Sequence, residues 1–272
     1  MSEKTIQVLS LGAGVQSSTL ALMAAKGEVT PMPEAAIFAD TGNEPAEVLD
    51  NLERLKKLLP FPVYTVKKKG GTLAEQVLKV KLSKHGNLYL PYQLPWYYSN
   101  KQEQTVVGMR TCTNHFKIQP VSKKIKQLLK EHDAQKCILW IGISWDEIQR
   151  VKDSRDNKIV HRYPLVDKRL TRASCIEWNH KHELPVPPRS ACTFCPFHNH
   201  EEFVKMKRDD PDTFKEATDF DDQLGEASRK TALGEVFVHR SLTRLKDVDL
   251  RSDEDKGQLD FFQNECAGFC GT

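Results

Sequence analysis

The chain has 272 residues, enough for one large domain or for a domain with a substantial appendage. Its apolar fraction of 39% and charged fraction of 28% are ordinary for a globular protein, and no apolar run approaches the roughly 20 residues of a membrane helix. The net charge of +3 neither demands nor excludes a nucleic-acid partner. The first residues show no signal peptide, which predicts a cytoplasmic protein with no membrane partner.

The N-terminal half alternates short apolar runs with amphipathic segments. Strands are expected at 6–11, 35–40, 63–66 and 137–143, with helices from 17 onward, at 44–59, 72–84 and 120–132. This alternation predicts a parallel α/β sheet. Residues 85–111 break the rhythm and indicate a long loop, and 160–166 indicates an extended segment.

The C-terminal half begins with an expected helix at 171–182. Pro185, Pro187 and Pro188 then fix an extended approach to Cys192. From about residue 199 onward the sequence is mainly helical and highly charged.

A small-residue turn, Gly12-Ala13-Gly14, follows the first expected strand. It leaves room for a ligand to approach the backbone. Ser17 and Ser18 then open a helix, whose N-terminus carries unpaired N–H groups and the positive end of a dipole. The stretch therefore predicts an anion site. A tight strand–helix turn in another doubly wound fold would look the same.

A polar turn, Asp40-Thr41-Gly42, ends the second apolar strand. In open α/β sheets ligands bind at this carboxyl edge of the strands. We therefore expect the turn to lie beside a ligand bound at the first loop. The other interpretation is a helix cap or a turn former.

Seven cysteines in a chain without a signal peptide indicate metal or redox chemistry, or buried thiols, rather than disulfides. Cys192 and Cys195 form a Cys-x-x-Cys pair, and Cys112 lies 80 positions earlier. Two thiolates at this spacing can ligate one metal centre, although a redox dithiol or a zinc knuckle has the same pattern. Cys175 is either a further ligand or a buried helix thiol.

The loop Gly12–Ser17 resembles the PP-loop of the adenine-nucleotide α-hydrolase superfamily, usually written Ser-Gly-Gly-x-Asp-Ser. The strand ending in Asp40-Thr41-Gly42 is similar to the phosphoadenylylsulfate (PAPS) reductase family within it. ATP-splitting members usually carry Asp where this chain has Gln16, whereas the reductases look more like this sequence.

The cysteines extend the resemblance. Iron–sulfur reductases of the family carry Cys-Cys-x-x-Arg-Lys-x-x-Pro and, about 80 residues later, Cys-x-x-Cys. Here Cys112, Lys117 and Pro120 match in register, while Thr113 and Phe116 replace the second Cys and the Arg. Three of four cluster cysteines therefore match.

The resemblance implies an α/β fold with a parallel-sheet, Rossmann-type (HUP-like) PP-loop domain at 1–166. A mainly helical C-terminal region at 167–272 would carry a Cys-rich metal site and a flexible Cys-containing tail. The implied cofactor is a [4Fe–4S] cluster, with Zn²⁺ as the alternative, and the implied nucleotide is ATP or PAPS/APS. The metal ligands would be Cys112, Cys175, Cys192 and Cys195.

The same resemblance assigns roles to individual residues. The catalytic candidates are Cys266, Asp40 and Lys117. Arg110 and Arg150 are anion-binding candidates, since a guanidinium offers a bidentate fork to phosphate or sulfate. The nucleotide would contact Ser10, Gly12, Ala13, Gly14, Gln16, Ser17, Ser18, Asp40, Thr41, Gly42, Arg110 and Arg150.

Two reactions stay open. In the first, an adenylylated sulfate is reduced: the Cys266 thiolate attacks sulfur and a reduced thioredoxin-like donor releases sulfite, as Gln16 and the Glu265-Cys266 tail favour. In the second, an ATP-dependent iron–sulfur sulfurtransferase thiolates tRNA or DNA. The missing fourth cysteine and the loops Lys67–Lys69 and Trp96–Tyr98 favour that reaction. A nucleotide or iron–sulfur sensor is a third option, and an oligomer is left open.

Overall fold

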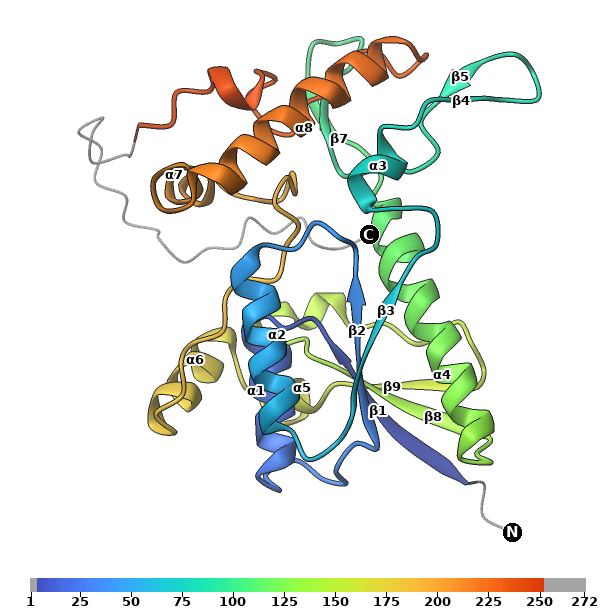
Figure 1. Ribbon diagram of the computed structural model, residues 1–272, viewed down its shortest axis with the longest axis vertical. Helices are drawn as coiled ribbons and strands as arrows, with labels where there is room; N and C mark the ends of the chain where they lie inside the picture. The colour runs from blue at the N-terminus through green and yellow to red at the C-terminus, as the bar shows by residue number, and fades with distance from the viewer. Residues whose placement is uncertain (1–3, 252–272) are drawn as a thin grey trace.

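A five-stranded parallel sheet with the order β3-β2-β1-β8-β9 forms the lower half of the molecule in Figure 1. The computed structural model describes residues 4–251. The strands are β1 (Thr5–Leu11), β2 (Ala35–Asp40), β3 (Val63–Lys67), β8 (Lys136–Ile141) and β9 (Ile159–Arg162). Because the chain runs outward from β1 to β3 and then returns beside β1 as β8, the topological switch point lies between β1 and β8. The predicted parallel α/β class is confirmed.

Helices cover both faces of the sheet, which explains why its strands are apolar runs rather than alternating ones. In β1, Leu9 and Leu11 face one side, and Ile6 and Val8 face the other. On the Leu9 side lie α1 (Val15–Ala25), α2 (Ala46–Leu58), α5 (Pro164–Asp167) and α6 (Arg172–Lys181). The opposite face packs against α4 (Gln119–Glu131) (Figure 1).

A second hydrophobic cluster lies beyond the carboxyl edge of the sheet. It contains fully buried Trp96, Phe194 and Phe203. Its elements are α3 (Leu73–Val77), the β6 (Tyr97–Ser99)–β7 (Thr105–Val107) hairpin, α7 (His200–Asp209), α8 (Pro211–Arg229) and the 3-10 turn η3 (Leu245–Asp247). The predicted helical character beyond residue 199 is therefore present up to residue 229. Residues from both sides of position 166 build this cluster, and the domain boundary proposed there stays a prediction.

Three expected elements differ. The helix expected at 72–84 ends at Val77, and Lys81–Leu82 (β4) instead pairs antiparallel with Leu88–Tyr89 (β5). Gly86, at φ +81°, supplies the turn that closes this hairpin. Residues 85–111 therefore contain strands rather than one long loop.

The segment expected to be extended at 160–166 splits into β9 and α5, since Pro164 stands at the first turn of α5, where a proline is favoured. A π-helix, η1 (Thr113–Ile118), precedes α4 and starts the helical region earlier than predicted. No helix within residues 4–251 is both long and apolar enough to cross a membrane.

Candidate nucleotide and cysteine site

The turn between β1 and α1 is held rigidly. Ala13 adopts φ +55°, and the Gly12 N–H donates to Ser17 Oγ at 3.1 Å. From α2, the Asn51 amide donates to the Ala13 carbonyl at 2.8 Å and to Ser18 Oγ at 3.0 Å. The Ser18 hydroxyl therefore points into the core, and the first N–H groups of α1, which have no intrahelical carbonyl, form the open side of the loop. An anion fits that side.

At two places another segment of the chain packs so closely against this loop that only a glycine fits. A Cβ on Gly14 would lie 2.9 Å from Cβ of Ser190, and a Cβ on Gly142, just after β8, would lie 2.9 Å from Cα of Ser17. The end of β8 and the segment before the Cys-x-x-Cys pair thus both pack on the loop. The sequence analysis named neither Gly142 nor Ser190. Gly142 could have been singled out from the sequence, because it is a glycine directly after an apolar strand. Nothing in the sequence singles out Ser190.

Gln16 and Arg150 are brought together by a residue that the sequence analysis did not name. Gln16 Nε2 lies 3.4 Å from one oxygen of Glu147, and Arg150 forms an ion pair with the other. Both Glu147 and Arg150 belong to the 3-10 segment η2 (Trp145–Arg150) that follows β8. The cation therefore stands beside the loop while paired with Glu147. Ser144, which caps η2, is fully buried, and its hydroxyl has no hydrogen-bond partner within residues 4–251.

The Asp40 turn lies at the end of β2, next to β1. Asp40 Oδ1 accepts the Gly42 N–H at 2.6 Å, and Oδ2 lies 2.6 Å from Lys67 Nζ. The hydrogen bond and the charge of Asp40 raise the pKa of Lys67. Gly42 adopts φ +79° with Thr72 packed against it. Asp40 therefore stabilises the turn through the Gly42 N–H, and it also forms an ion pair with Lys67 at the edge of the sheet.

Thr41 connects this turn to the cysteines. Its N–H and its hydroxyl donate to the buried carboxylate of Glu44, at 3.1 and 2.9 Å, and the hydroxyl also lies 3.5 Å from Cys192 Sγ. Lys117 Nζ is 3.9 Å from Glu44. Burial raises the pKa of Cys192 to about 12, with Lys117 opposing and Glu44 reinforcing the shift. Glu44, absent from the sequence-based candidates, thus lies between the turn and Lys117.

Cys195 lies among cations and a backbone donor. Burial raises the pKa of its thiol, and the neighbouring Cys112 adds to the rise, while the Phe197 N–H, Arg110 and Arg189 oppose it. The Arg110 guanidinium stands over the Phe197 ring, 5.3 Å from its centre. The Cys195 thiol thus lies near enough to those of Cys112 and Cys192 for their charges to influence one another, and two arginines and a lysine act on the same thiols.

Cys175 belongs to a different part of the molecule. It is fully buried on α6, in the cluster between the sheet and α1, whereas Cys112 and Cys192 pack against the second cluster. Burial raises the pKa of Cys175 to about 12, as it does for Cys137 in β8. The structure therefore does not bring Cys175 to the other three thiols, and its surroundings are those of a core thiol. Cys266 lies outside the described residues.

The surroundings of two of the thiols suit the negative charge of an iron–sulfur cluster. Cys195 has the Phe197 N–H and two arginines near it, and Cys192 has Lys117 near it. Within residues 4–251, no three His, Cys, Asp or Glu side chains converge closely enough to hold one metal ion. A tetrahedral Zn²⁺ needs that convergence, whereas the cysteines of a [4Fe–4S] cluster each bind a different iron.

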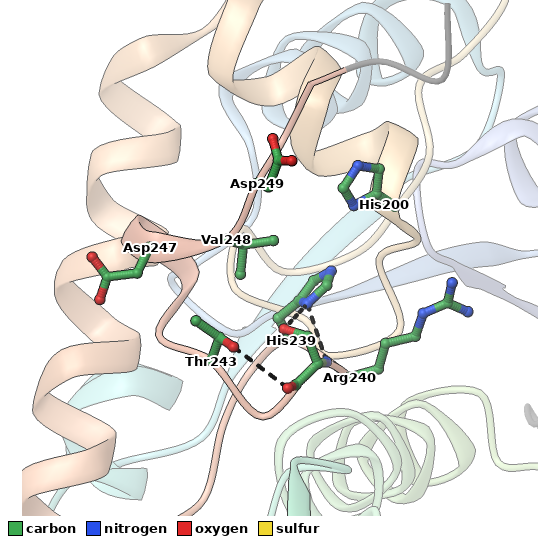
Figure 2. Close-up of a pocket in the computed structure, with 8 residues that line it drawn as sticks. His200, His239, Arg240, Thr243, Asp247, Val248 and Asp249 are labelled. Atoms are coloured by element: carbon green, nitrogen blue, oxygen red, sulfur yellow. Dashed lines mark hydrogen bonds between the residues drawn. The ribbon is translucent and has the colours of Figure 1, made fainter. Parts of the chain in front are cut away.

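A separate open hollow of about 500 Å³ lies between the start of α7 and the segment 239–249 (Figure 2). The Ser241 N–H donates to His239 Nδ1 at 3.2 Å. Burial, reinforced by His200 and Arg240, lowers the pKa of His239 to about 4, so the imidazole is neutral near pH 7. No residue proposed from the sequence lines this hollow.

No family model and no curated protein matches the chain. Among solved structures, the chain is similar to a phosphoadenylyl-sulfate (PAPS) reductase from Candida auris in a phosphate complex, at 15% identity and a TM-score of 0.41, covering 69% of this chain and 76% of that one. It is also similar to the U34-tRNA thiolase NcsA from Methanococcus maripaludis with its [4Fe-4S] cluster, at 14% identity and a TM-score of 0.45, covering 82% and 73%.

Proposed function

We propose that this protein is a PAPS reductase-like PP-loop enzyme that uses an adenine nucleotide in sulfur chemistry at a cysteine centre. The observation that carries the proposal is the contact between Thr41 and Cys192, because it joins the turn expected beside the nucleotide to the Cys-x-x-Cys pair. The packing of Ser190 on Gly14 makes a second junction between the same two elements. A reacting group bound to the nucleotide would therefore lie close to the thiols.

The nucleotide would occupy the switch point between β1 and β8. Its phosphates or sulfate would bind the N–H groups at the start of α1, with Arg150 as the flanking cation. The turn Asp40–Gly42 would form the adjoining wall. Support comes from the close packing of Ser190 on Gly14 and of Gly142 on Ser17, because these contacts support the loop from both sides without any ligand.

The cysteine centre would be a [4Fe–4S] cluster held by Cys112, Cys192 and Cys195. Three thiolates leave one iron without a cysteine ligand, so the cluster would supply a position where sulfur can bind. Lys117, Arg110 and the Phe197 N–H would stabilise its negative charge. Cys175 is left out of this ligand set, because it is buried in the sheet core.

For the reaction itself, the first candidate is reduction of PAPS or APS. The Cys266 thiolate would attack the sulfur and displace adenosine 3′,5′-bisphosphate or AMP, which leaves an S-sulfonate on Cys266. A reduced thioredoxin-like dithiol would then release sulfite, restore the Cys266 thiol and become a disulfide. Gln16 in place of the usual aspartate and the Glu265-Cys266 tail favour this reaction. Lys117, which lies beside Cys192, would bind the anionic substrate, whereas Lys67 is already paired with Asp40.

The second candidate is ATP-dependent thiolation of tRNA or DNA. The specific observation in its favour is the set of three cysteines rather than four, since a cluster with an open iron can carry sulfur to an acceptor. In this reaction the same loop would bind ATP, and the activated acceptor would meet the cluster.

One experiment separates the candidates. Anaerobically reconstituted protein is incubated with PAPS plus reduced thioredoxin, or with ATP with and without RNA or DNA, and the nucleotide products are separated by ion-exchange chromatography. Sulfite with adenosine 3′,5′-bisphosphate supports the reductase. Pyrophosphate that depends on added nucleic acid supports the sulfurtransferase. Failure to bind or consume either nucleotide overturns the proposal.

A further inference from the structure

Charge is distributed very unevenly along this chain. Residues 67–130 contain thirteen Lys and Arg but only two acidic residues, Glu75 and Glu103, which gives the stretch a net charge of +11. Because the whole chain carries +3, the remaining residues carry −8. The modest overall charge therefore conceals a strongly basic region.

Much of this region lies along one side of the molecule, while its β6–β7 hairpin lies near α8. The β4–β5 hairpin, α3 and α4 follow one another from top to bottom along the right-hand side of Figure 1, whereas α1, α2 and α6 lie on the left. At 1.5 Å per residue, the 13 residues of α4 extend about 20 Å, the length of roughly six base pairs at 3.4 Å each. The basic side is thus long enough to follow a nucleic-acid backbone.

Five of these thirteen cations are available for a partner. Lys79, Lys81 and Lys84 on and beside the hairpin, and Lys123 and Lys130 on α4, are exposed. In the part of the chain that the structure describes, none of these five has an ion pair with a carboxylate. Other lysines of the stretch do have one: Lys67 pairs with Asp40, Lys117 with Glu44 and Lys126 with Asp156. Five positive charges without partners on one side favour an anionic ligand.

The basic side ends at the cysteine site. Lys117 contacts Glu44, and Arg110 stands over Phe197, two residues after Cys195. Near its outer end, Tyr89 on β5 is 43% exposed beside the lysines of the hairpin. Lysines interleaved with an exposed aromatic ring are typical of surfaces that bind nucleic acids.

We propose that this basic face, formed by the β4–β5 hairpin and α4, binds the phosphodiester backbone of a nucleic acid and leads the strand to the cysteine centre. The inference deepens the second candidate function and rests on it for the role of the bound strand. Binding itself depends only on the face. A duplex carries one phosphate charge per 1.7 Å of its axis, which matches a long row of cations better than a compact anion does.

The test uses the full chain and fluorescently labelled 30-nucleotide RNA and DNA, single- and double-stranded, with binding followed by anisotropy from 50 to 300 mM salt. We expect affinity to fall steeply with salt. The Lys79→Glu/Lys81→Glu/Lys84→Glu variant should bind at least about tenfold more weakly at 100 mM salt, with a salt slope smaller by about two to three. The Lys123→Gln/Lys130→Gln variant should show a smaller loss in the same direction.

The matched control reverses three exposed lysines outside the face, Lys168→Glu/Lys181→Glu/Lys230→Glu, and should change affinity less than twofold. Equal affinity of the wild type and both face variants would overturn the proposal, as would wild-type binding to anionic vesicles or polyglutamate but to no nucleic acid. Because no nucleotide is turned over in this assay, its result is independent of the proposed reaction. The RNA and DNA arms identify which polymer is bound.

Discussion

The hydroxyl of Thr41 lies 3.5 Å from the sulfur of Cys192, although the two residues are 151 positions apart in the chain. The same hydroxyl donates to Glu44, so one side chain connects the turn after β2, a buried carboxylate and a thiol.

Thr41→Val should destabilise the fold by about 1–3 kcal/mol, because the buried Glu44 loses a donor and the valine cannot replace it. Thr105→Val is the control, since Thr105 is exposed on β7, where a valine is well accommodated. The measurement is the free energy of unfolding in urea. Equal stabilities for the two variants would show that the Thr41 hydroxyl does not support the site.

Gly142→Ala should lower stability by about 1–3 kcal/mol and weaken nucleotide binding, since the new Cβ would lie 2.9 Å from Cα of Ser17 and push α1 away from its loop. Gly12→Ala places its Cβ 3.5 Å from the nearest atom, an ordinary contact, so its stability should change by less than about 0.5 kcal/mol. Thermal unfolding compares the two variants, and calorimetric titration with ATP compares Gly142→Ala with the wild type. A Gly142→Ala protein with wild-type affinity would contradict this packing argument.

Cys192→Ser should lose most of the iron that anaerobic reconstitution loads, whereas Cys175→Ala should keep it and lose only about 1 kcal/mol of stability. The physical reason is location: Cys192 faces Thr41 at the sheet edge, and Cys175 is buried against α1. Iron and labile sulfide are measured per chain. Equal loss of iron in both variants would return Cys175 to the ligand set.

Glu202 provides a prediction about pH. Burial is the largest influence and would raise its pKa, but the neighbouring His198 imidazole and the Arg189 guanidinium, together with the Asn199 N–H, outweigh it and hold the pKa at about 2, below the ordinary 4.5. A depressed pKa means that the carboxylate stabilises the fold above pH 4.5 and that this contribution disappears between pH 4.5 and 2. Its size is at most about 3 kcal/mol.

Glu202→Gln isolates this effect, since a glutamine can still accept the Asn199 N–H in the capping box of α7. The wild type should be more stable than the variant at pH 7, and the gap should narrow as the pH falls below 4.5. Unfolding in urea from pH 7 to 3 measures it. A gap that does not change with pH would mean that the charge of Glu202 contributes nothing.

Glu147 should limit the affinity of the loop for anions, because it already pairs with Arg150. Glu147→Gln is expected to strengthen nucleotide binding a few-fold, and Arg150→Ala to weaken it. Calorimetric titration of both variants decides. If Arg150→Ala binds as the wild type does, Arg150 does not contact the phosphates.

The sheet could be predicted from the sequence because strands buried on both faces, such as 6–11 and 137–141, must be apolar runs. The hairpin at 81–89 was missed because its strands have only two residues each, too few for a period to be seen. Trp96 was expected in a loop that favours a nucleic-acid substrate, but it is fully buried in the second cluster, where no base can stack on it.

Within the site, only residues that belong to a local pattern could be named in advance. Gly14 stands in a motif, but its partner Ser190 does not, and nothing near position 190 signals the contact. Glu44 and Asn51 were missed for the same reason: each looks like an ordinary helix or turn residue until the tertiary fold brings Thr41 or Ala13 to it. Cys175 shows the opposite error: it was named as a metal ligand but is buried in the core. The number of cysteines in a sequence cannot distinguish a ligand from a core thiol.

The sequence separation between Thr41 and Cys192 also determines when their contact can form during synthesis of the chain. A growing chain that has passed β3 already contains the residues of the glycine loop and of the turn after β2, yet the thiols that face this turn are added more than a hundred residues later. Contacts of such long range form late in folding, because the loop that they close is costly in entropy. The cluster proposed at Cys112, Cys192 and Cys195 could therefore be inserted only after residue 195 has been synthesised, about 80 residues after Cys112.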